Sequence, residues 1–346
     1  MATRYAKFAW ALLLYTLPVI VYGAFVRASL SGDGCGAHWP DCYGQLLPTG
    51  GELKRYIEYI HRFSSGLYGL LALTVWIGAF RVFPKGHVVR KAASFTMFFT
   101  VVEALLGAVL VKKGWVATDD SVGRAVAMSV HLANTFLLLA SAALTALWAS
   151  GVPRMRFRGQ GPVGWALVIG LVGLLVLGIS GAVTALGDTI FPAAGSHLDT
   201  VTMAMSPTAH FLVRLRVLHP LIAMSVGVYM VLLAGLVSHL RPSQAVKRAS
   251  QWVTGVFLFE LALGLLNLAM KAPIAMQLVH LFVADVLWIC LIVLGAHALA
   301  EGVPQAETPT SAPSEPVREK RPMGEVVKEY LILASRAAVA FCSLRR

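Results

Sequence analysis

Eight long apolar stretches dominate this sequence of 346 residues. A helix needs about 20 residues to cross the ~30 Å hydrocarbon core of a bilayer. Because 57% of the residues are hydrophobic and only 13% are charged, the chain lies outside the range of soluble proteins. We therefore expect an all-α integral membrane protein with eight transmembrane helices. The expected helices cover residues 8–26, 56–80, 92–111, 123–149, 163–186, 212–238, 251–270 and 274–300.

The distribution of charge predicts how these helices are oriented. The N-terminus and the connections after the even-numbered helices carry twelve Lys and Arg residues and no Asp or Glu, whereas the other connections mix nine bases with seven acids. Positively charged connections stay in the cytoplasm, so both termini are expected there. This orientation accounts for the formal net charge of +12 without a nucleic-acid partner. With no cleavage site or transit-type leader visible, a bacterial cytoplasmic membrane is the expected location.

The two halves of the chain repeat the same features in the same order. Since each unit contains four helices, the repeats are expected to be parallel and to form two four-helix bundles side by side. We expect one bundle in residues 1–150 and the other in 151–300. The matched features are Gly23 with Gly181, His61 with His219, Glu103 with Glu260, and His131 with His280.

The composition changes after Ala300. A Pro-rich polar segment that cannot bury a core follows, so residues 301–346 are expected to be a linker and a cytoplasmic tail. Within the tail, residues 323–346 are too interrupted by charge for a ninth span and are expected to form an interfacial helix.

Four of the ten histidines lie inside the apolar stretches, two in each half of the chain. A buried imidazole costs free energy unless it has a partner, so an intramembrane histidine is a candidate functional residue. Two neutral imidazoles that face each other across a four-helix bundle can supply both axial ligands of a haem iron, whereas zinc favours additional Cys or carboxylate ligands. We therefore expect one haem pocket in each bundle. The four residues are His61, His131, His219 and His280.

The halves differ at one position beside these histidines. Glu58 lies one helical turn before the first histidine, and an offset of 158 places Arg216 at the matching position. Glu58 is a candidate acid–base residue, with an ion pair to Arg55 or Arg62 as the alternative. Arg214 and Arg216 are either partners of haem propionates or exposed loop charges.

Other chemistry-bearing residues have plainer interpretations. Glu103 and Glu260 are expected to take part in hydrogen bonds between helices, and the role of Asp285 is left open. Cys35 and Cys42 lie in one loop on the expected oxidising side, where they predict a disulfide. Catalytic thiol exchange is the alternative for this pair.

Several of these motifs together resemble the haem A synthase family. They are the segment Gly23-Ala-Phe-Val-Arg27, the two-cysteine loop, and Glu58-x-x-His61-Arg62, followed by the three later intramembrane histidines. The resemblance covers about residues 8–300, and the Glu-x-x-His-Arg segment and the loop are its most specific parts.

The resemblance implies an activity and a role for each bundle. Members of the family oxidise the C8 methyl group of haem O to the formyl group of haem A, with a resident b-type haem. By this resemblance the first bundle, with Glu58, would receive haem O on His61 and His131. The second bundle would hold haem B on His219 and His280. The implied partners are a haem O synthase and a membrane electron donor within the lipid bilayer. The loop at 187–211 contains no cysteine, so a two-disulfide relay is not expected.

Two further observations limit this interpretation. Residues 323–333 resemble the start of protohaem farnesyltransferases, which make haem O, but the resemblance ends after Leu333. A dihaem b-type protein that carries electrons from quinol to an outer acceptor would share the four histidines, and a proton-coupled transporter would share the repeats. The source of the formyl oxygen, the electron donor and the number of chains in the assembly are left open.

Overall fold

The computed structural model describes residues 1–45, 47–193 and 195–305, and the expected tail helix at 323–346 lies outside these ranges. The named elements within them are all helices, and eight spans are long and apolar enough to cross a membrane. The prediction of an all-α protein with eight transmembrane helices is confirmed, and the chain is a multi-pass membrane protein. The helices are α1 (Ala2–Ala28), α2 (Leu53–Val82), α3 (Val88–Lys112), α4 (Val122–Ala149), α5 (Pro162–Ile190), α6 (His197–Met205), α7 (Phe211–Leu215), α8 (Leu218–Leu240), α9 (Gln244–Ala269) and α10 (Ile274–Ala298).

The apolar pattern predicts neither the helix in the connection at 187–211 nor the interruption of the sixth span. Helix α6 lies within that connection, and it begins with a capping box in which Ser196 and Asp199 bond each other's backbone N–H groups. The bonds from Ser196 hold the pKa of Asp199 below its usual range. The sixth span is interrupted between α7 and α8, because Pro220 has no N–H to donate to the carbonyl of Arg216.

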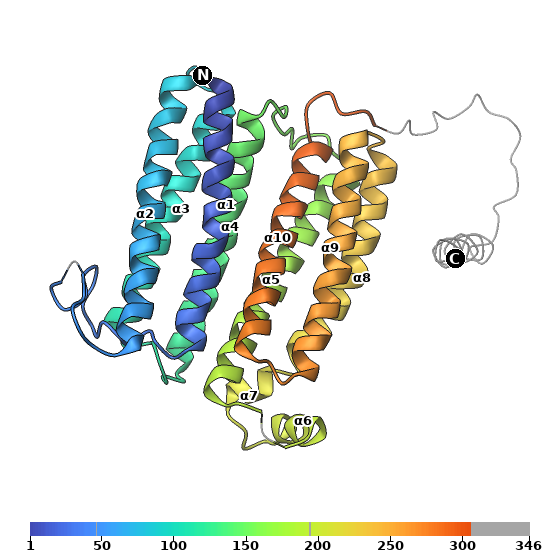
Figure 1. The fold of residues 1–346 in the computed structure, drawn as a ribbon. Helices are drawn as coiled ribbons and strands as arrows, with labels where there is room; N and C mark the ends of the chain where they lie inside the picture. Colours follow the sequence, from blue (N-terminus) through green and yellow to red (C-terminus); the bar gives the residue numbers. More distant parts are fainter. Residues whose placement is uncertain (46, 194, 306–346) are drawn as a thin grey trace, which may run out of the picture. The chain divides into compact units, whose positions relative to one another are not determined.

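The long helices form two groups of four (Figure 1). In the first group, α1 and α3 each pack against both α2 and α4. In the second, α5 and α9 each pack against both α8 and α10. Helices α2 and α4 are therefore diagonal to each other, as are α8 and α10. The two groups meet where α1 and α4 pack against α5 and α10.

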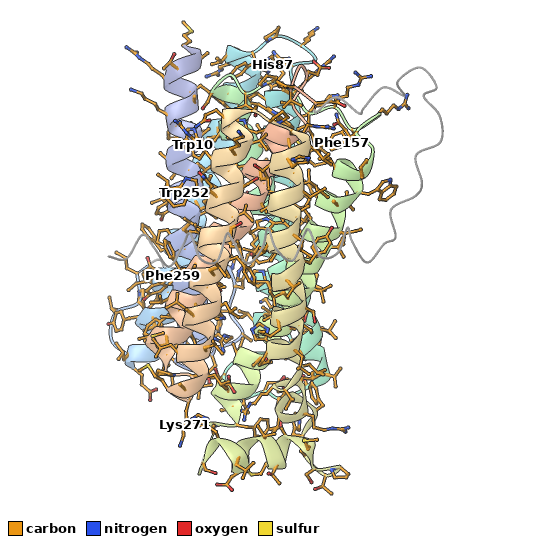
Figure 2. The ribbon with its side chains drawn as sticks, turned by 90° about the vertical axis from the view of Figure 1, so that its right-hand side faces the viewer. Trp10, His87, Phe157, Trp252, Phe259 and Lys271 are labelled. Atoms are coloured by element: carbon orange, nitrogen blue, oxygen red, sulfur yellow. A yellow bond between two sulfur atoms is a disulfide. The ribbon has the colours of Figure 1, made fainter. Side chains whose placement is uncertain are left out.

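The outer surfaces of the groups are apolar. Trp252 and Phe259 on α9, for example, lie on the side turned toward the viewer of Figure 2, and their exposed fractions are 67% and 56%. A helix surface that faces lipid gains nothing from polar side chains, and its backbone groups are satisfied within the helix. Exposed aromatic and aliphatic residues on these helices are therefore the expected lipid-facing surface.

The buried core of each group is concentrated in the half that contains the N-terminus of α1. The first group is packed there by Tyr5, Leu12, Val75 and Val89. The corresponding core of the second group includes Leu167, Leu233, Val253 and Leu294. The opposite half of each group is packed differently, and it contains the four intramembrane histidines.

Candidate functional site

The helical segments around the four histidines contain no buried residue, although the other half of each helix does. The segments that carry the histidines are 59–67 and 126–133 in the first group and 218–226 and 274–282 in the second. Their neighbours at the same level are equally free of buried residues over 18–25, 101–112, 175–185 and 261–269. Protein interiors are normally close-packed. The pattern therefore indicates that each group leaves space at the level of its histidine pair for a group that the protein does not itself supply.

His219 and His280 face each other across the second group from the diagonal helices α8 and α10. Their ring centroids are 6.4 Å apart and the rings are nearly perpendicular, at 81°. Imidazole nitrogens bind first-row metal ions at about 2 Å, so this separation suits one ion between the rings. Within the described ranges, no cluster of three or more His, Cys, Asp or Glu residues is placed to hold a metal ion. Two imidazoles without further protein ligands fit a metal that brings its own equatorial ligands, as haem iron does.

Two of the histidines are each paired with a glutamate on a neighbouring helix. The Nδ1 atom of His131 lies 3.1 Å from Oε1 of Glu103, joining α4 to α3. The Nδ1 atom of His280 lies 3.0 Å from Oε1 of Glu260, joining α10 to α9. Histidines that bind metals commonly donate their second ring nitrogen to a carboxylate. Both pairs therefore leave Nε2 as the nitrogen available to a ligand.

The two glutamates differ in their other partners. Glu103 also accepts hydrogen bonds from Asn134 Nδ2 at 2.6 Å and from Thr135 Oγ1 at 2.5 Å. Among the described residues, Oε2 of Glu260 has no hydrogen-bond partner, nor has either carboxyl oxygen of the fully buried Asp285. The carboxylate in the first group is thus held from three sides, and the one in the second group is held mainly by its histidine.

The remaining two histidines differ in what holds Nδ1. The Nδ1 atom of His219 lies 2.9 Å from the hydroxyl oxygen of Ser180 on α5. The repeat offset of 158 places Tyr22 opposite this serine, and the tyrosine ring stacks on His61 with centroids 6.4 Å apart. Among the described residues, Nδ1 of His61 has no hydrogen-bond partner. The second group therefore places an oxygen atom within 3.0 Å of Nδ1 in both of its imidazoles, whereas the first does so, at 3.1 Å, only for His131.

The repeated glycines explain how these rings reach their positions. A Cβ atom at Gly23 would lie 2.7 Å from Cε1 of His61, and one at Gly181 would lie 3.0 Å from Cε1 of His219. Contacts this short do not fit a side chain without movement of the ring. Glycine at both positions lets an imidazole pack directly against the backbone of α1 or α5, which gives the repeat a structural reason.

Glu58 is buried near the N-terminal end of α2, one turn before His61, with an exposed fraction of 3%. Its Oε2 accepts the backbone N–H of Cys35 at 2.8 Å, and its Oε1 forms an ion pair with Arg62. Of the two arginines considered from the sequence, Arg62 is thus the partner. The carboxylate connects the base of the first long loop to the helix that carries His61.

The loop itself is closed by a disulfide between Cys35 and Cys42, which confirms the predicted pairing. Arg62 donates from Nη1 to the carbonyl oxygens of His38 and Asp41, each at 2.6 Å. The same guanidinium therefore neutralises the buried carboxylate and holds the loop against α2.

Arg216 occupies the position that matches Glu58, and its partners are different. Its Nε lies 2.7 Å from Oδ1 of Asp188, and its Nη2 donates to the carbonyl oxygens of Gly187 at 2.6 Å and of Phe191. The guanidinium thus binds the end of α5, as a cation at a helix C-terminus does favourably. Arg214, the other arginine singled out from the sequence, is exposed on α7.

Arg27 is a residue that the sequence pattern did not distinguish from other loop bases. It donates from Nη1 to the carbonyl of Ala185 at 2.7 Å and to the hydroxyl of Thr189 at 2.6 Å, and from Nη2 to Gln277 at 3.0 Å. It therefore joins α1 of the first group to α5 and α10 of the second. The available signal in the sequence was its place in the Gly-Ala-Phe-Val-Arg segment. Ala185, whose carbonyl it binds, is the residue that matches Arg27 at the repeat offset of 158.

Comparison with known proteins places this arrangement in a family. Two proteins from strains of Thermus thermophilus, each named protoheme IX farnesyltransferase, are 50% identical to this chain over 305 residues, or 88% of the chain. Those residues are 50% of each Thermus protein, so this chain spans half the length of these relatives.

Shorter matches lead to proteins of another name. A heme A synthase from Halalkalibacterium halodurans is 38% identical over 90 residues, which are 26% of this chain and 30% of that protein. One from Symbiobacterium thermophilum is 37% identical over 133 residues, which are 37% of this chain and 40% of that protein. The family model of the cytochrome oxidase assembly proteins matches residues 6–292, a range that contains every histidine, glutamate and arginine described above. The chain therefore belongs to the COX15-CtaA family of cytochrome oxidase assembly proteins.

Proposed function

We propose that this chain is a haem A synthase, an oxidoreductase that converts the C8 methyl group of haem O to the formyl group of haem A. The observation that carries the proposal is the pair of loosely packed sites, each with two histidines in matched positions and a glutamate behind one of them. Membership of the family and the likeness to proteins named heme A synthase support the same activity.

The two sites are proposed to play different roles. A resident cofactor must stay bound through many turnovers, and His219 and His280 each have a side-chain oxygen within 3.0 Å of Nδ1. We assign haem B to this pair. A substrate must enter, and its product must leave, which suits a site with one unfixed imidazole. We assign haem O to His61 and His131.

Haem B, when bound, would carry single electrons between the substrate site and a redox partner in the membrane. The chain's own residues handle the protons. Oxidation of a methyl group releases protons, and Glu58, one turn from His61, is the carboxylate placed to accept one. Arg62 keeps this carboxylate oriented through the ion pair, and the N–H of Cys35 holds its other oxygen.

The proposed location is a bacterial cytoplasmic membrane with both termini in the cytoplasm and the histidines near the outer face. The support is the charge pattern, because the connections at the end with the packed cores carry bases and no acids. A protohaem farnesyltransferase is the proposed source of haem O, and that name is carried by the two Thermus relatives. The proposed haem contacts of Arg214 and Arg216 with propionates would have to form beside the existing bonds of Arg216.

A pigment analysis tests the proposal directly. The chain is expressed in a bacterium that makes haem O and lacks its own haem A synthase, and the extracted haems are separated by chromatography. We expect haem A and its hydroxylated intermediate with the wild-type chain and neither with a His61→Ala variant. A purified protein that shows a bis-histidine haem spectrum but leaves haem O unchanged would instead be the dihaem electron-transfer protein. Absence of any haem absorption would exclude both functions.

A further inference from the structure

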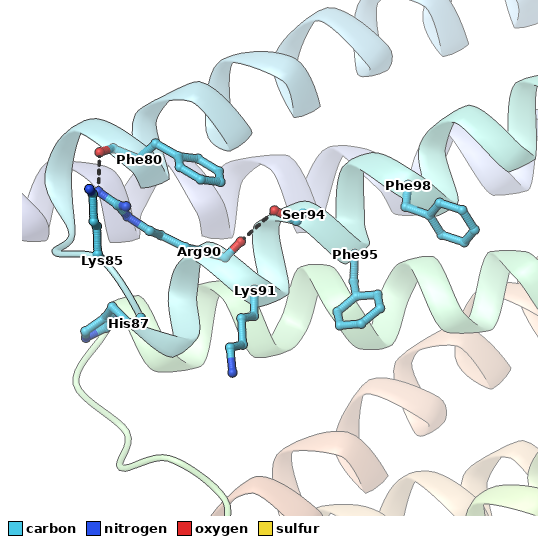
Figure 3. Close-up of a pocket in the computed structure, with 9 residues that line it drawn as sticks. Phe80, Lys85, His87, Arg90, Lys91, Ser94, Phe95 and Phe98 are labelled. Atoms are coloured by element: carbon cyan, nitrogen blue, oxygen red, sulfur yellow. Dashed lines mark hydrogen bonds between the residues drawn. The ribbon is translucent and has the colours of Figure 1, made fainter.

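A groove of about 720 Å³ lies at the connection between α2 and α3 (Figure 3). It is at the end of the first group that contains the N-terminus of α1. The groove is outside the sites described above. Its lining includes Phe80, Lys85, Arg90, Lys91, Phe95 and Phe98.

One end of the groove is basic. Lys85, His87, Arg90 and Lys91 all line it, and residues 83–102 contain no Asp or Glu. Among the described residues, neither Lys85 nor Lys91 forms an ion pair with a carboxylate. An uncompensated cluster of this kind at the end of membrane-spanning helices favours an anionic group.

Arg90 has a different role from the two lysines. Its guanidinium donates to the carbonyl oxygens of Phe83 at 2.8 Å and Phe80 at 2.7 Å, and it lies 5.0 Å from the centre of the Phe80 ring. These contacts fix the connection between α2 and α3 against the C-terminal end of α2. Figure 3 shows Lys91 extending freely from α3, away from Arg90. The lysines are therefore the groups available to a ligand.

The rest of the groove is aromatic and exposed. Phe95 and Phe98 have exposed fractions of 58% and 57%. Lys91, Phe95 and Phe98 are spaced i, i+4 and i+7 on α3, so they lie along one face of that helix. About 10 Å of helix separates the lysine from the second phenylalanine. This is a basic group followed, deeper in the membrane, by an apolar surface, which is the order of phosphate and acyl chains in a phospholipid.

The repeat provides an internal comparison. A second groove of about 540 Å³ lies on α9 and is lined by Gln251, Trp252, Gly255, Val256 and Phe259. The offset of 157 between α3 and α9 matches Ser94 with Gln251 and Phe95 with Trp252. The second groove keeps the exposed aromatic surface, but no basic residue lines it. The same offset matches Arg90 with Lys247 and Lys91 with Arg248, so the repeat keeps two bases at the start of α9. Those two bases do not line the second groove, whereas Arg90 and Lys91 line the first.

We propose that the groove between α2 and α3 binds one phospholipid with an anionic headgroup. Lys85 and Lys91 hold the phosphate, and the acyl chains lie over Phe95 and Phe98. This site does not depend on the proposed enzymatic function.

Native mass spectrometry of the full chain, purified in detergent and mixed with equal amounts of phosphatidylglycerol and phosphatidylcholine, tests the proposal. One basic residue near an anionic membrane surface contributes on the order of fivefold to binding. We therefore expect that the double variant Lys85→Gln/Lys91→Gln lowers bound phosphatidylglycerol by roughly tenfold or more. Bound phosphatidylcholine should change little.

Three controls keep the result interpretable. Arg156→Gln/Arg158→Gln removes the same charge from another connection at the same end of the helices, and it should leave phosphatidylglycerol binding unchanged. Phe95→Ala should weaken binding of the lipid while all four basic residues remain. Inorganic phosphate at millimolar concentration should not displace the bound lipid.

Other outcomes would overturn the proposal. An equal loss with the two control arginines would mean that the lipid responds to the general charge of this end of the protein. Displacement by inorganic phosphate would mean a phosphate site, and equal binding of both lipids by the wild-type chain would mean no charge selection. A protein cross-linked through a photoreactive residue at position 95, in place of lipid, would mean a protein-docking surface.

Discussion

The two helical groups have the same histidines and different surroundings. In each, two histidines on diagonal helices lie in a loosely packed half, and one of them is paired with a glutamate. The groups differ where Ser180 faces Nδ1 of His219 while Tyr22 stacks on His61. The comparison teaches that the candidate ligands are common to both repeats, whereas the groups that set how firmly a ligand is held are not.

The connections beside the sites differ in the same way. The first is closed by the Cys35–Cys42 disulfide and held by the carboxylate of Glu58. The connection between α5 and α7 contains α6, and the guanidinium of Arg216 binds the C-terminal end of α5. A carboxylate in one repeat and a guanidinium in the other present opposite charges at matched positions. Of these two groups, only the carboxylate of Glu58 can accept a proton, and the proposed roles of the two sites use this difference.

The largest expected effect comes from removing a ligand of the second group. His219→Ala or His280→Ala should abolish the low-spin haem B spectrum, because one imidazole cannot supply both axial positions. His61→Ala should retain that spectrum. Reduced-minus-oxidised absorption of the purified variants measures the effect, with His239→Ala, at the other end of α8, as the control. A full-strength bis-histidine spectrum in both variants would remove the assignment of haem B to this pair.

The next largest effect is expected at the carboxylate that has no counterpart. Glu58→Gln keeps an oxygen for the N–H of Cys35 but cannot accept a proton or pair with Arg62 as an anion. We expect haem A formation to fall on the order of 10²-fold or more, as for loss of a general acid–base group, with haem B retained. The ratio of haem A to haem B in extracts measures this.

Glu52→Gln is the matched control for that variant, because Glu52 is exposed at the start of α2. It should leave the ratio at the wild-type value. If the Glu58→Gln protein also kept that value, Glu58 would act only in holding the loop, and the strongest difference between the two groups would have no catalytic meaning.

A smaller effect is expected from the partners of Nδ1. Ser180→Ala leaves His219 in place but removes the hydroxyl that holds its ring. Loss of such a partner typically lowers metal affinity by about 10–100-fold, so haem B should transfer faster to apomyoglobin. Tyr22→Ser introduces that hydroxyl in the first group and should slow the release of haem from it.

Ser225→Ala controls for the loss of a hydroxyl on α8, since Ser225 is exposed and its hydroxyl donates to the carbonyl of Leu221 on the same helix. It should leave the rate of haem transfer unchanged. Equal transfer rates for the wild-type chain and the Ser180→Ala variant would show that the difference in Nδ1 partners does not separate a retained haem from an exchanged one.

The smallest effect is expected from the disulfide. The loop that it closes is short, with a sequence separation of 7, so its loss should cost about 2–3 kcal/mol of loop stability. The variant Cys35→Ser/Cys42→Ser should show faster proteolysis in the first connection, an unchanged haem B spectrum and part of the turnover. Alkylation of Cys35 and Cys42 in the wild-type chain should require prior reduction. Complete loss of turnover at normal haem content would favour thiol exchange in catalysis.

The sequence was sufficient for features that depend on one helix at a time. The eight spans follow from the length and hydropathy of each run, and the placement of Glu58 one turn from His61 follows from helical periodicity. The interruption before Pro220 and the helix at His197–Met205 were missed because a hydropathy pattern registers apolar length and not backbone hydrogen bonding. The disulfide was accessible because both cysteines lie in one loop.

What lies between helices was decided by the tertiary structure alone. The sequence left Glu58 with two arginine partners, gave Glu103 no named partner, and did not distinguish Arg27 from an exposed base. The fold pairs Glu58 with Arg62, places Glu103 against His131, and places the donors of Arg27 between the two groups. The physical reason is that periodicity fixes which residues share a face of one helix. The rotation of each helix about its axis, which determines what that face meets, depends on the packing of all eight together.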